Sequence, residues 1–461
     1  MSKVPEGMTL VVGLGISGRA ICRHLRRESR PFMVADTRAA PPGLDTFQND
    51  FPDVAVYCGP LSGLDMSEAE EVVLSPGVSP DDPGLARLKS QARSPSVIGE
   101  MALFTRACQA PIAAVTGSNA KSTVTTLLGE MAAAAGLRVA VGGNLGTPAL
   151  DLLHDTPDAQ LFVLELSSFQ LETTPELGAD TVAFLNLSED HLDRHGGMTG
   201  YRRAKQRIFA GARYALVNGE DAMTWPDAEV PVVERFTTQP PGPGEWGIAE
   251  HDADNGDGPT LWLMHGTEPL MPAAVVRAPG RHNQANALAA LAMGHHVGLP
   301  LPAMRRVLER FSGLPHRCEL VAEHAGVRWI NDSKGTNVGA TLAAIAGIGP
   351  TLTGRLVLLA GGDGKGADFA PLAEPLAAYG REAIVFGRDA GQLEAALEQS
   401  LPVTRVVDLA AALQRATEVA QAGDCVLLSP ACASLDQFPD YQVRGDAFRD
   451  GVTQQLNEVA L

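Results

Sequence analysis

The chain has 461 residues, which at about 150 residues per domain suggests roughly three domains. Its 54 acidic residues outnumber its 36 basic ones, and this balance argues against a broad nucleic-acid-binding surface, because such surfaces are basic. The N-terminus lacks the apolar core of a signal peptide and no apolar run approaches 18 residues, so we expect a cytoplasmic protein without a membrane span. The six cysteines have neither metal-site nor disulfide spacing, and we expect free thiols.

The first predicted unit is a strand at residues 9–12, a glycine-rich loop at residues 13–18, a helix, and a second strand that ends at Asp36. This order is the dinucleotide-binding fingerprint. It requires only a phosphate near a helix N-terminus and a hydroxyl on a carboxylate, so NAD or another nucleotide diphosphate satisfies it. A further strand runs into a turn at Ser75, which is either a ligand-binding edge of the sheet or an ordinary loop.

A Ser/Pro-rich stretch at residues 91–99 indicates a domain boundary, and the run PIAAV after it predicts a buried strand. The segment TVTTLLGEMAAAAG predicts a helix that ends at Gly136. The loop between them, residues 117–123, would lie at a helix N-terminus, where backbone N–H groups and the helix dipole favour phosphate.

Lys121 in this loop would add a charge for terminal phosphates, and the Ser122 hydroxyl would reach a Mg²⁺. The match to the P-loop is imperfect, because Ala120 takes the place of the last glycine and Gly117 lies only four residues before the lysine. The motif alone therefore also fits a plain strand–helix turn with a surface lysine.

The next strong strand ends at Glu165, which would be placed to hold Mg²⁺ beside a phosphate loop, or would be a solvated strand-end carboxylate. A later strand runs into the acid- and histidine-rich segment 188–195. His191 there is an unusual ligand for Mg²⁺, and Asp190 and Asp193 equally suit the capping of the following helix. That helix carries Lys205, for which composition alone predicts a surface lysine.

Residues 218–270 are rich in Pro, Gly and Asp, and we expect a small β region there, followed by two helices. Alternating strands and helices after residue 313 predict a second open α/β sheet. The expected fold is α/β with three domains: an N-terminal Rossmann-like domain (1–97), a central P-loop-type ATPase domain with a parallel sheet (98–313) and a C-terminal Rossmann-like domain (314–461).

Ten segments occur in the order found in one family: TGSNAKST, GGNLG, ELSSFQLE, NLSEDHLDRHG, YRRAKQRIF, GRHNQANALAAL, LPHRCE, NDSKGTN, LAGGDGK and SPACASLDQF. Over essentially its whole length the chain resembles the Mur ligases, and most closely those that add D-glutamate. Each motif is weak or moderate by itself, whereas together they are highly specific.

The resemblance implies an ATP-dependent ligase that joins D-glutamate to UDP-N-acetylmuramoyl-L-alanine in peptidoglycan precursor synthesis, and so serves cell wall biogenesis, cell shape and cell division. The L-alanine carboxylate would attack the γ-phosphate of ATP, and the amine of D-glutamate would then attack the acyl phosphate. Positioning and electrostatics would supply the rate. Two Mg²⁺ ions, ATP as co-substrate and a monomeric chain are expected.

The resemblance also implies site residues. The catalytic residues would be Lys121, His191 and Lys205. The ATP-binding residues would be Gly117, Ser118, Asn119, Ala120, Lys121, Ser122, Thr123, Asn286, Arg317 and Asp332. The UDP-substrate-binding residues would be Gly15, Ile16, Ser17, Asp36, Thr37, Ser75 and Asn144. The D-glutamate-binding residues would be Lys334, Thr336, Lys365, Ser434, Leu435 and Tyr441. The metal ligands would be Ser122, Glu165, His191 and a carbamylated Lys205.

The chain departs from the family's pattern at two of these positions. Most of the family has glycine where this chain has Ala120, and alanine costs little there if its φ is negative. Tyr441 stands where another aromatic residue also occurs. Three alternatives stay open: another Mur-type or folylpolyglutamate ligase, an NAD-dependent dehydrogenase built on the first glycine loop, and a nucleotide sensor without catalysis.

Overall fold

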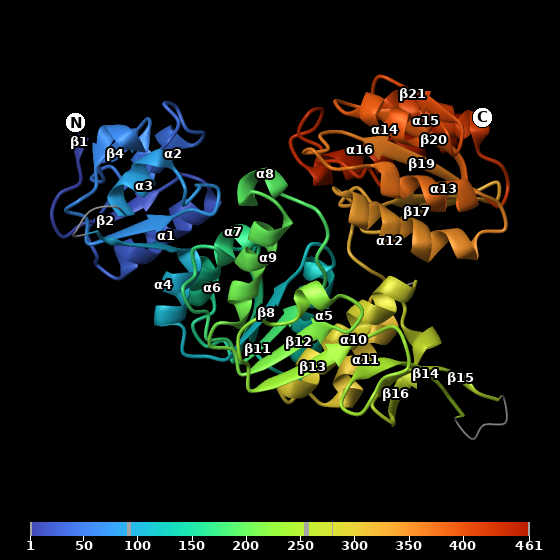
Figure 1. Cartoon of the computed structure of the whole chain (residues 1–461), viewed down its shortest axis with the longest axis horizontal. Helices are drawn as coiled ribbons and strands as arrows, with labels where there is room; N and C mark the ends of the chain where they lie inside the picture. The colour runs from blue at the N-terminus through green and yellow to red at the C-terminus, as the bar shows by residue number, and fades with distance from the viewer. Residues whose placement is uncertain (1, 90–93, 253–257, 279, 460–461) are drawn as a thin grey trace. The chain divides into compact units, whose positions relative to one another are not determined.

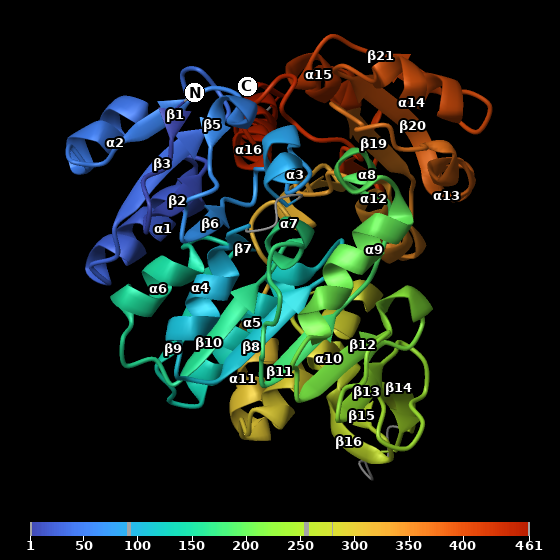
Figure 2. The same ribbon diagram turned by 60° about the vertical axis from the view of Figure 1, so that its left-hand side comes forward.

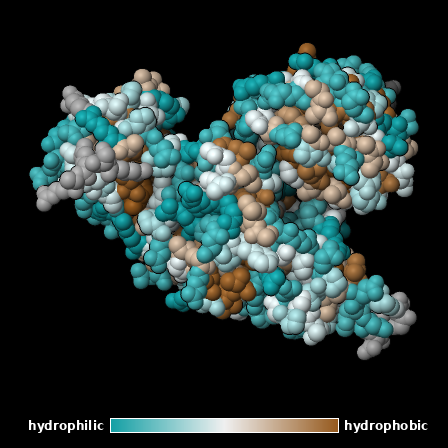
Figure 3. All heavy atoms as spheres, in the orientation of Figure 1, coloured by the Kyte–Doolittle hydropathy of each residue, from teal (hydrophilic) through white to brown (hydrophobic). Residues whose placement is uncertain are grey.

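The computed structural model describes residues 2–89, 94–252, 258–278 and 280–459 of an α/β protein (Figure 1). The chain separates into two compact units. One unit contains residues 1–186, 200–271 and 287–307, and the other contains residues 187–199, 272–286 and 308–461. Within the described residues, none of the helices combines the length and apolar character needed to cross a bilayer. The face shown in Figure 3 is mostly hydrophilic, with apolar residues in small groups.

The first unit begins with a five-stranded parallel sheet, which confirms the two strands expected around the first glycine loop. Its strands in sheet order are β4 (Val56–Cys58), β3 (Phe32–Asp36), β2 (Thr9–Val12), β6 (Glu71–Leu74) and β7 (Ser96–Gly99). A short pair, β1 (Ser2–Lys3) and β5 (Leu64–Asp65), lies apart from this sheet. The helices are α1 (Ile16–Arg27), α2 (Leu44–Asp50) and α3 (Pro83–Lys89). The expected boundary between residues 97 and 98 falls inside β7, and the domain boundaries stay a prediction.

The same unit contains a nine-stranded sheet, in the order β16-β15-β14-β13-β12-β11-β8-β10-β9 (Figure 2). Its strands are β8 (Ile112–Thr116), β9 (Val139–Gly143), β10 (Leu161–Glu165), β11 (Thr181–Phe184), β12 (Tyr214–Asn218), β13 (Val232–Phe236), β14 (Trp246–His251), β15 (Thr260–His265) and β16 (Glu268–Pro272). The neighbouring strands from β9 to β14 pair in parallel, and β14 pairs with β15 antiparallel. The strands expected within residues 218–270 therefore extend this sheet and do not form a separate region.

Helices precede, connect and follow the strands of the nine-stranded sheet along the chain. They are α4 (Glu100–Ala107), α5 (Lys121–Ala134), α6 (Ala149–Asp155), α7 (Ser168–Leu171), α9 (Met198–Gln206), α10 (Arg281–His296) and α11 (Leu301–Arg310). The strands β8, β10 and β11 are buried along their whole length. Such strands read as continuous apolar runs, which is why the sequence indicated them.

The second unit is built on a six-stranded sheet in the order β17-β18-β22-β19-β20-β21. Its strands are β17 (Glu319–His324), β18 (Val327–Asn331), β19 (Leu356–Gly361), β20 (Gly380–Phe386), β21 (Val403–Arg405) and β22 (Cys425–Leu428). The β17–β18 pair is antiparallel, and the described pairs β18–β22, β22–β19, β19–β20 and β20–β21 are parallel. Its helices are α8 (Leu192–His195), α12 (Val338–Ile348), α13 (Ala373–Tyr379), α14 (Ala390–Leu397), α15 (Leu409–Val419) and α16 (Tyr441–Val459).

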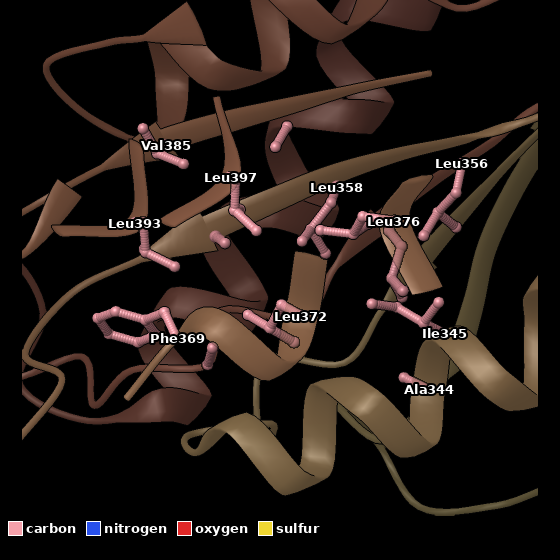
Figure 4. Packing of buried hydrophobic residues seen from close by; sticks show 14 of the residues in the cluster. Ala344, Ile345, Leu356, Leu358, Phe369, Leu372, Leu376, Val385, Leu393 and Leu397 are labelled. Carbon is pink, nitrogen blue, oxygen red and sulfur yellow. The ribbon is translucent and has the colours of Figure 1, made fainter. Parts of the chain in front are cut away.

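Two apolar layers hold the second unit together, one on each face of the sheet. Figure 4 shows the first layer, in which Ile345, Leu376 and Leu393 come from three helices and belong to one apolar cluster with Leu358 of β19. The opposite face packs against α15 and α16, through Phe448 among others. Because β22 lies between β18 and β19, the loops that follow these three strands meet at one edge of the sheet, the usual position of a ligand site in this architecture.

Candidate active site

The loop expected to bind phosphate connects β8 to α5, as predicted. Gly117 begins it with a φ of +158°. Asn186, just after β11, holds the loop: its carbonyl accepts the Ser118 N–H at 2.9 Å, and its side-chain oxygen accepts the Asn119 N–H at 2.8 Å. The Asn186 amide in turn donates to the Asn119 carbonyl at 3.1 Å. Sequence reasoning missed this residue, although an asparagine directly after a buried strand was a signal for it.

Ala120 has a φ of +66° and forms the N-cap of α5. The expectation that alanine costs little here depended on a negative φ, and that premise is wrong. The chain takes a left-handed conformation at this position as it turns from the loop into the helix. A side chain in that conformation places Cβ close to the following carbonyl oxygen and costs about 1–2 kcal/mol.

Two lysines lie at this loop. Lys121 Nζ donates to the carbonyl oxygens of Gly117 and Ser118, both at 2.9 Å. Lys205 Nζ donates to the same Gly117 oxygen at 2.8 Å and to Thr116 Oγ1 at 3.3 Å. Lys205 is 1% exposed, and its amine lies 4.8 Å from the centre of the Tyr201 ring. The surface-lysine alternative is therefore wrong for Lys205, and the structure brings it to the loop that contains Lys121.

Glu165 ends β10 and is buried, so it is not a solvated strand-end carboxylate. Ser122 Oγ donates to its Oε2 at 2.5 Å, and Asn144 Nδ2 donates to its Oε1 at 2.6 Å. The chain then enters α7 through a capping box between Ser167 and Gln170, which fixes the end of the strand. A hydroxyl and a carboxylate at a phosphate-type loop are oxygen donors of the kind that Mg²⁺ prefers, so these residues fit the expected ion.

His191 lies in the second unit, as the N-cap of the short helix α8, with a φ of +53°. Its Nε2 is 3.7 Å from the Asp190 carboxylate. That carboxylate also accepts from Lys365 Nζ at 2.6 Å and from Asn337 Nδ2 at 3.4 Å. The N-cap residue of α8 makes no side-chain capping bond. Capping of α9, the helix that carries Lys205, by Asp190 or Asp193 stays a prediction. His191, Thr336 and Lys365 line one pocket of this unit.

Asp36 follows the pattern of the first glycine loop but bonds to the protein itself. Its Oδ2 accepts the Leu14 N–H at 2.9 Å, and its Oδ1 accepts Arg38 Nε at 2.8 Å. Burial opposes ionisation, yet the hydrogen bonds from Arg38 and Leu14 outweigh it and hold the pKa of Asp36 below its usual value. A Cβ at Gly18 would overlap the Gly13 carbonyl, so the tight turn requires glycine there. The bond between Arg38 and Asp36 was not predicted from the sequence. The position of Arg38 shortly after the end of β3 was its only signal.

Among the expected ATP residues of the second unit, Asp332 follows β18 and lies buried. It accepts from Ser429 Oγ at 2.7 Å and from the Cys318 N–H at 3.2 Å. Burial raises the pKa of Asp332 to about 6, although Ser429 and the charge of nearby Arg317 oppose that rise. Asn286 bonds within its own helix, to Asn283.

The residues expected to receive D-glutamate come from three loops and the start of α16. Lys334 Nζ lies 3.9 Å from the centre of the Tyr441 ring, a cation–π contact. Ser434 is buried, whereas the neighbouring Leu435 is 70% exposed. Thr336 and Lys365 lie in the pocket already described, so this set lies along one edge of the sheet.

Arg444 on α16 is a buried residue that the sequence did not single out. Its guanidinium donates to Ser333 Oγ at 3.0 Å, to the Ser333 carbonyl at 2.8 Å, to the Gly361 carbonyl at 3.3 Å and to the Cys432 carbonyl at 3.1 Å. Burial lowers the pKa of Arg444 to about 10. One side chain thus ties together the loops after β18 and β22 and the last residue of β19.

All six cysteines are free, as expected. Among the residues that the structure describes, no three or more His, Cys, Asp or Glu side chains gather in a metal-binding group. The oxygen donors at the phosphate-type loop are one carboxylate and one hydroxyl, a set that Mg²⁺ completes with water and phosphate oxygens.

Three protein-family models match successive parts of the chain: the Mur ligase MurD-like N-terminal domain at residues 7–99, the Mur ligase middle domain at residues 115–294 and the Mur ligase glutamate ligase domain at residues 316–432. The UDP-N-acetylmuramoylalanine--D-glutamate ligase of Chromohalobacter salexigens is 69% identical over 97% of this chain and 98% of its own length. The enzyme of the same name from Pseudomonas aeruginosa is 50% identical over 96% of this chain and 97% of its own.

Solved structures agree on the fold. The MurF ligase of Thermotoga maritima in complex with ADP has a TM-score of 0.59 and 16% identity, and the match covers 92% of this chain and 95% of that one. The UDP-N-acetylmuramate-alanine ligase MurC of the same organism has a TM-score of 0.58 and 16% identity over 97% and 99% of the two chains. The family models and the closely similar sequences establish that the chain belongs to the Mur ligase family.

Proposed function

We propose that this protein is an ATP-dependent ligase that joins D-glutamate to UDP-N-acetylmuramoyl-L-alanine. The observation that carries the proposal is the loop at the N-terminus of α5, where Lys121, Ser122 and Glu165 stand together. Two sequences with that activity in their names are 69% and 50% identical to this one over nearly the full length. The alternative is a related ligase that adds another amino acid.

On the nucleotide side, the N–H groups of residues 117–123 and the α5 dipole would bind the phosphates of ATP. Lys121, whose amine now bonds loop carbonyls, would turn to the γ-phosphate and stabilise the charge that develops on it. Ser122 and Glu165 would hold a Mg²⁺, which when bound neutralises phosphate charge. Asn286, Arg317 and Asp332 would receive the adenine and ribose.

Lys205 would act as its carbamate. As an amine it is a poor ligand for a hard cation, whereas a carbamate supplies anionic oxygens. The amines of Lys205 and Lys121 donate to the same carbonyl oxygen, so as cations they repel each other. A carbamate on Lys205 would be negative and would attract the Lys121 amine instead. With His191 the carbamate would hold a second Mg²⁺.

The UDP substrate would bind at the glycine-rich loop of the N-terminal sheet, and D-glutamate would bind at the loops of the C-terminal sheet. The loop Gly15–Ser17, with Asp36, Thr37, Ser75 and Asn144, would hold the UDP substrate, so the first glycine loop would serve UDP and not NAD. Lys334 and Lys365 supply two positive charges for the two carboxylates of D-glutamate, and Thr336, Ser434, Leu435 and Tyr441 would complete that site. The amine of D-glutamate would then attack the acyl phosphate, with phosphate as the leaving group.

Phosphate release by the purified protein tests the proposal, with UDP-N-acetylmuramoyl-L-alanine, ATP, Mg²⁺ and D-glutamate each omitted in turn. We expect turnover only when all four are present. Turnover with L-alanine or meso-diaminopimelate but not D-glutamate would assign the chain to another ligase. ATP binding without amino-acid-dependent phosphate release would indicate a sensor, and tight NADH binding would indicate a dehydrogenase.

A further inference from the structure

Glu100 is a buried carboxyl group that the mechanism above does not use. It is the first residue of α4 and is 1% exposed. Helices α1, α4 and α6 lie side by side in the first unit (Figure 2). Glu100 Oε1 accepts the Leu150 N–H of α6 at 3.4 Å, and the Ser17 side chain in the first turn of α1 is close enough to the carboxyl group to lower its pKa.

The other carboxyl oxygen, Oε2, is buried and has no hydrogen-bond partner among the residues that the structure describes. A fully ionised carboxylate left in this state is costly, because each of its oxygens needs donors when water is excluded. The neutral form needs fewer compensating groups. The Glu100 carboxyl group is therefore protonated more readily than the carboxyl group of a solvated glutamate.

The charged groups nearby do not compensate Glu100. Asp151 on α6 adds a second negative charge, and Arg23 on α1 is engaged with it through two hydrogen bonds, at 2.9 and 2.5 Å. Farther along the same two helices, His24 and His154 contact each other at 3.1 Å, and Asp155 ends α6. Burial raises the pKa of Glu100 to about 7; Asp151 acts in the same direction, and Ser17 with the N–H groups of α6 acts against it.

Ser17 lies beside this carboxyl group and is also one of the residues expected to bind the UDP substrate. At this point the inference rests on the proposed function. The diphosphate of a UDP-sugar carries two negative charges and neither gains nor loses a proton near neutral pH. Bound at the first turn of α1, it would lie close to Glu100, and two anions repel strongly where water is excluded. A neutral carboxyl group removes that repulsion.

We propose that Glu100 is a positioning residue that takes up a proton when the UDP substrate binds at Gly15–Ser17, so that substrate affinity is linked to pH. The proton passes from solvent to the Glu100 carboxylate, and no bond of the substrate changes. The neutral carboxyl group still accepts the Leu150 N–H and so keeps the first turns of α4 and α6 together. Glu100 acts on the substrate only through Ser17 and through its charge.

Calorimetric titration of the full-length protein with UDP-N-acetylmuramoyl-L-alanine, without ATP or D-glutamate, tests the proposal. Repeating it at pH 8 in buffers of different ionisation enthalpy counts the protons taken up. We expect close to one proton per substrate, and a Kd that weakens by up to about tenfold per pH unit above pH 7 and is flat below about pH 6. Glu100→Gln, which is neutral at every pH, should take up none and bind with a pH-independent Kd.

His154→Gln is the matched control, because His154 is a nearby titratable group of the same helix interface, and burial lowers its pKa. It should keep the wild-type proton count. Substrate binding without proton uptake by the wild type, or uptake that persists in Glu100→Gln, overturns the inference and leaves the proposed function standing. No binding at all overturns both. If Glu100→Gln does not fold, the proton count of the wild type decides alone.

Discussion

Lys121 and Lys205 donate to the same oxygen, the carbonyl of Gly117, from positions 84 residues apart in the chain. Lys121 reaches it from the first turn of α5, and Lys205 reaches it from α9. A carbonyl oxygen has two lone pairs and can accept both amines, but the arrangement holds two cationic groups close together, which disfavours their charged forms. We infer that the convergence serves the chemistry of the loop, and the two lysines should respond differently to substitution.

Lys205→Ala should lower kcat at least about hundredfold, the range seen when a preorganised charge of this kind is removed. If the lysine acts as a carbamate, formate or acetate should restore part of the activity, because each supplies the missing carboxylate oxygens. Steady-state phosphate release with and without these ions measures the rescue. Lys121→Ala is the control: it should be equally impaired but insensitive to carboxylates. Normal turnover by Lys205→Ala would disprove the carbamate role.

Ala120→Gly should stabilise the protein by roughly 0.5–1 kcal/mol. Glycine relieves the left-handed strain at a φ of +66°, although it also gives the unfolded chain more freedom. Urea unfolding compares the variant with the wild type. Ala133→Gly, an exposed position in the same helix, should instead destabilise it by up to about 1 kcal/mol. If both substitutions destabilise equally, Ala120 is not strained.

The sequence predicted the open parallel sheets well, because buried parallel strands are continuous apolar runs punctuated by glycine loops. Strand β8, helix α12 and the strand before Asp332 lie where their patterns placed them. Strand β21 has only three residues, and β17 carries polar residues at both ends; neither gives a periodic signal.

The details of the site were less predictable, for two physical reasons. Burial depends on distant neighbours: Lys205 is covered by residues almost 90 positions earlier in the chain, so composition indicated a surface side chain. Backbone conformation is also set by the turn as a whole, and the alanine at position 120 gave no sign of a positive φ. The ligand roles of the expected residues stay predictions until substrates are bound.

Arg444→Lys should destabilise the protein by several kcal/mol. A lysine cannot replace a planar guanidinium that bonds two loops and the end of a strand, and each buried carbonyl left without a donor costs about 1–3 kcal/mol. Because these loops carry the expected D-glutamate residues, the KM for D-glutamate should rise more than kcat falls. Urea unfolding and steady-state kinetics measure the two effects. Arg449→Lys, on the same helix but with exposed ion pairs, should change stability by less than about 1 kcal/mol.

Asp332→Asn should become increasingly stabilising, relative to the wild type, as the pH rises through the window from about 4 to 6. Burial raises the pKa of Asp332 to about 6, above its value in the unfolded chain. Between these two pKa values the folded protein keeps a proton that the unfolded chain has lost, so the wild type loses stability as the pH rises through this window. Between pH 4.5 and 7.5 the difference in unfolding free energy should shift by about 2 kcal/mol in favour of the variant.

The buried pair of Asp424 and Arg381 provides a control with the opposite sign. Burial of Asp424 opposes its ionisation, but the Arg381 guanidinium, at 2.5 Å, and the N–H groups of Arg355 and Gln421 outweigh it and lower its pKa. The folded state therefore gains stability as the pH rises toward the unfolded pKa near 4 and keeps it above that value, so the cost of Asp424→Asn should grow up to about pH 4 and stay constant above about pH 5. Urea unfolding of both variants from about pH 3 to 7.5 measures the two profiles. If the profile of Asp332→Asn above pH 5 is as flat as that of Asp424→Asn, Asp332 ionises at its ordinary pKa, in which case its buried carboxylate is compensated by Ser429 and Arg317 more fully than its surroundings indicate.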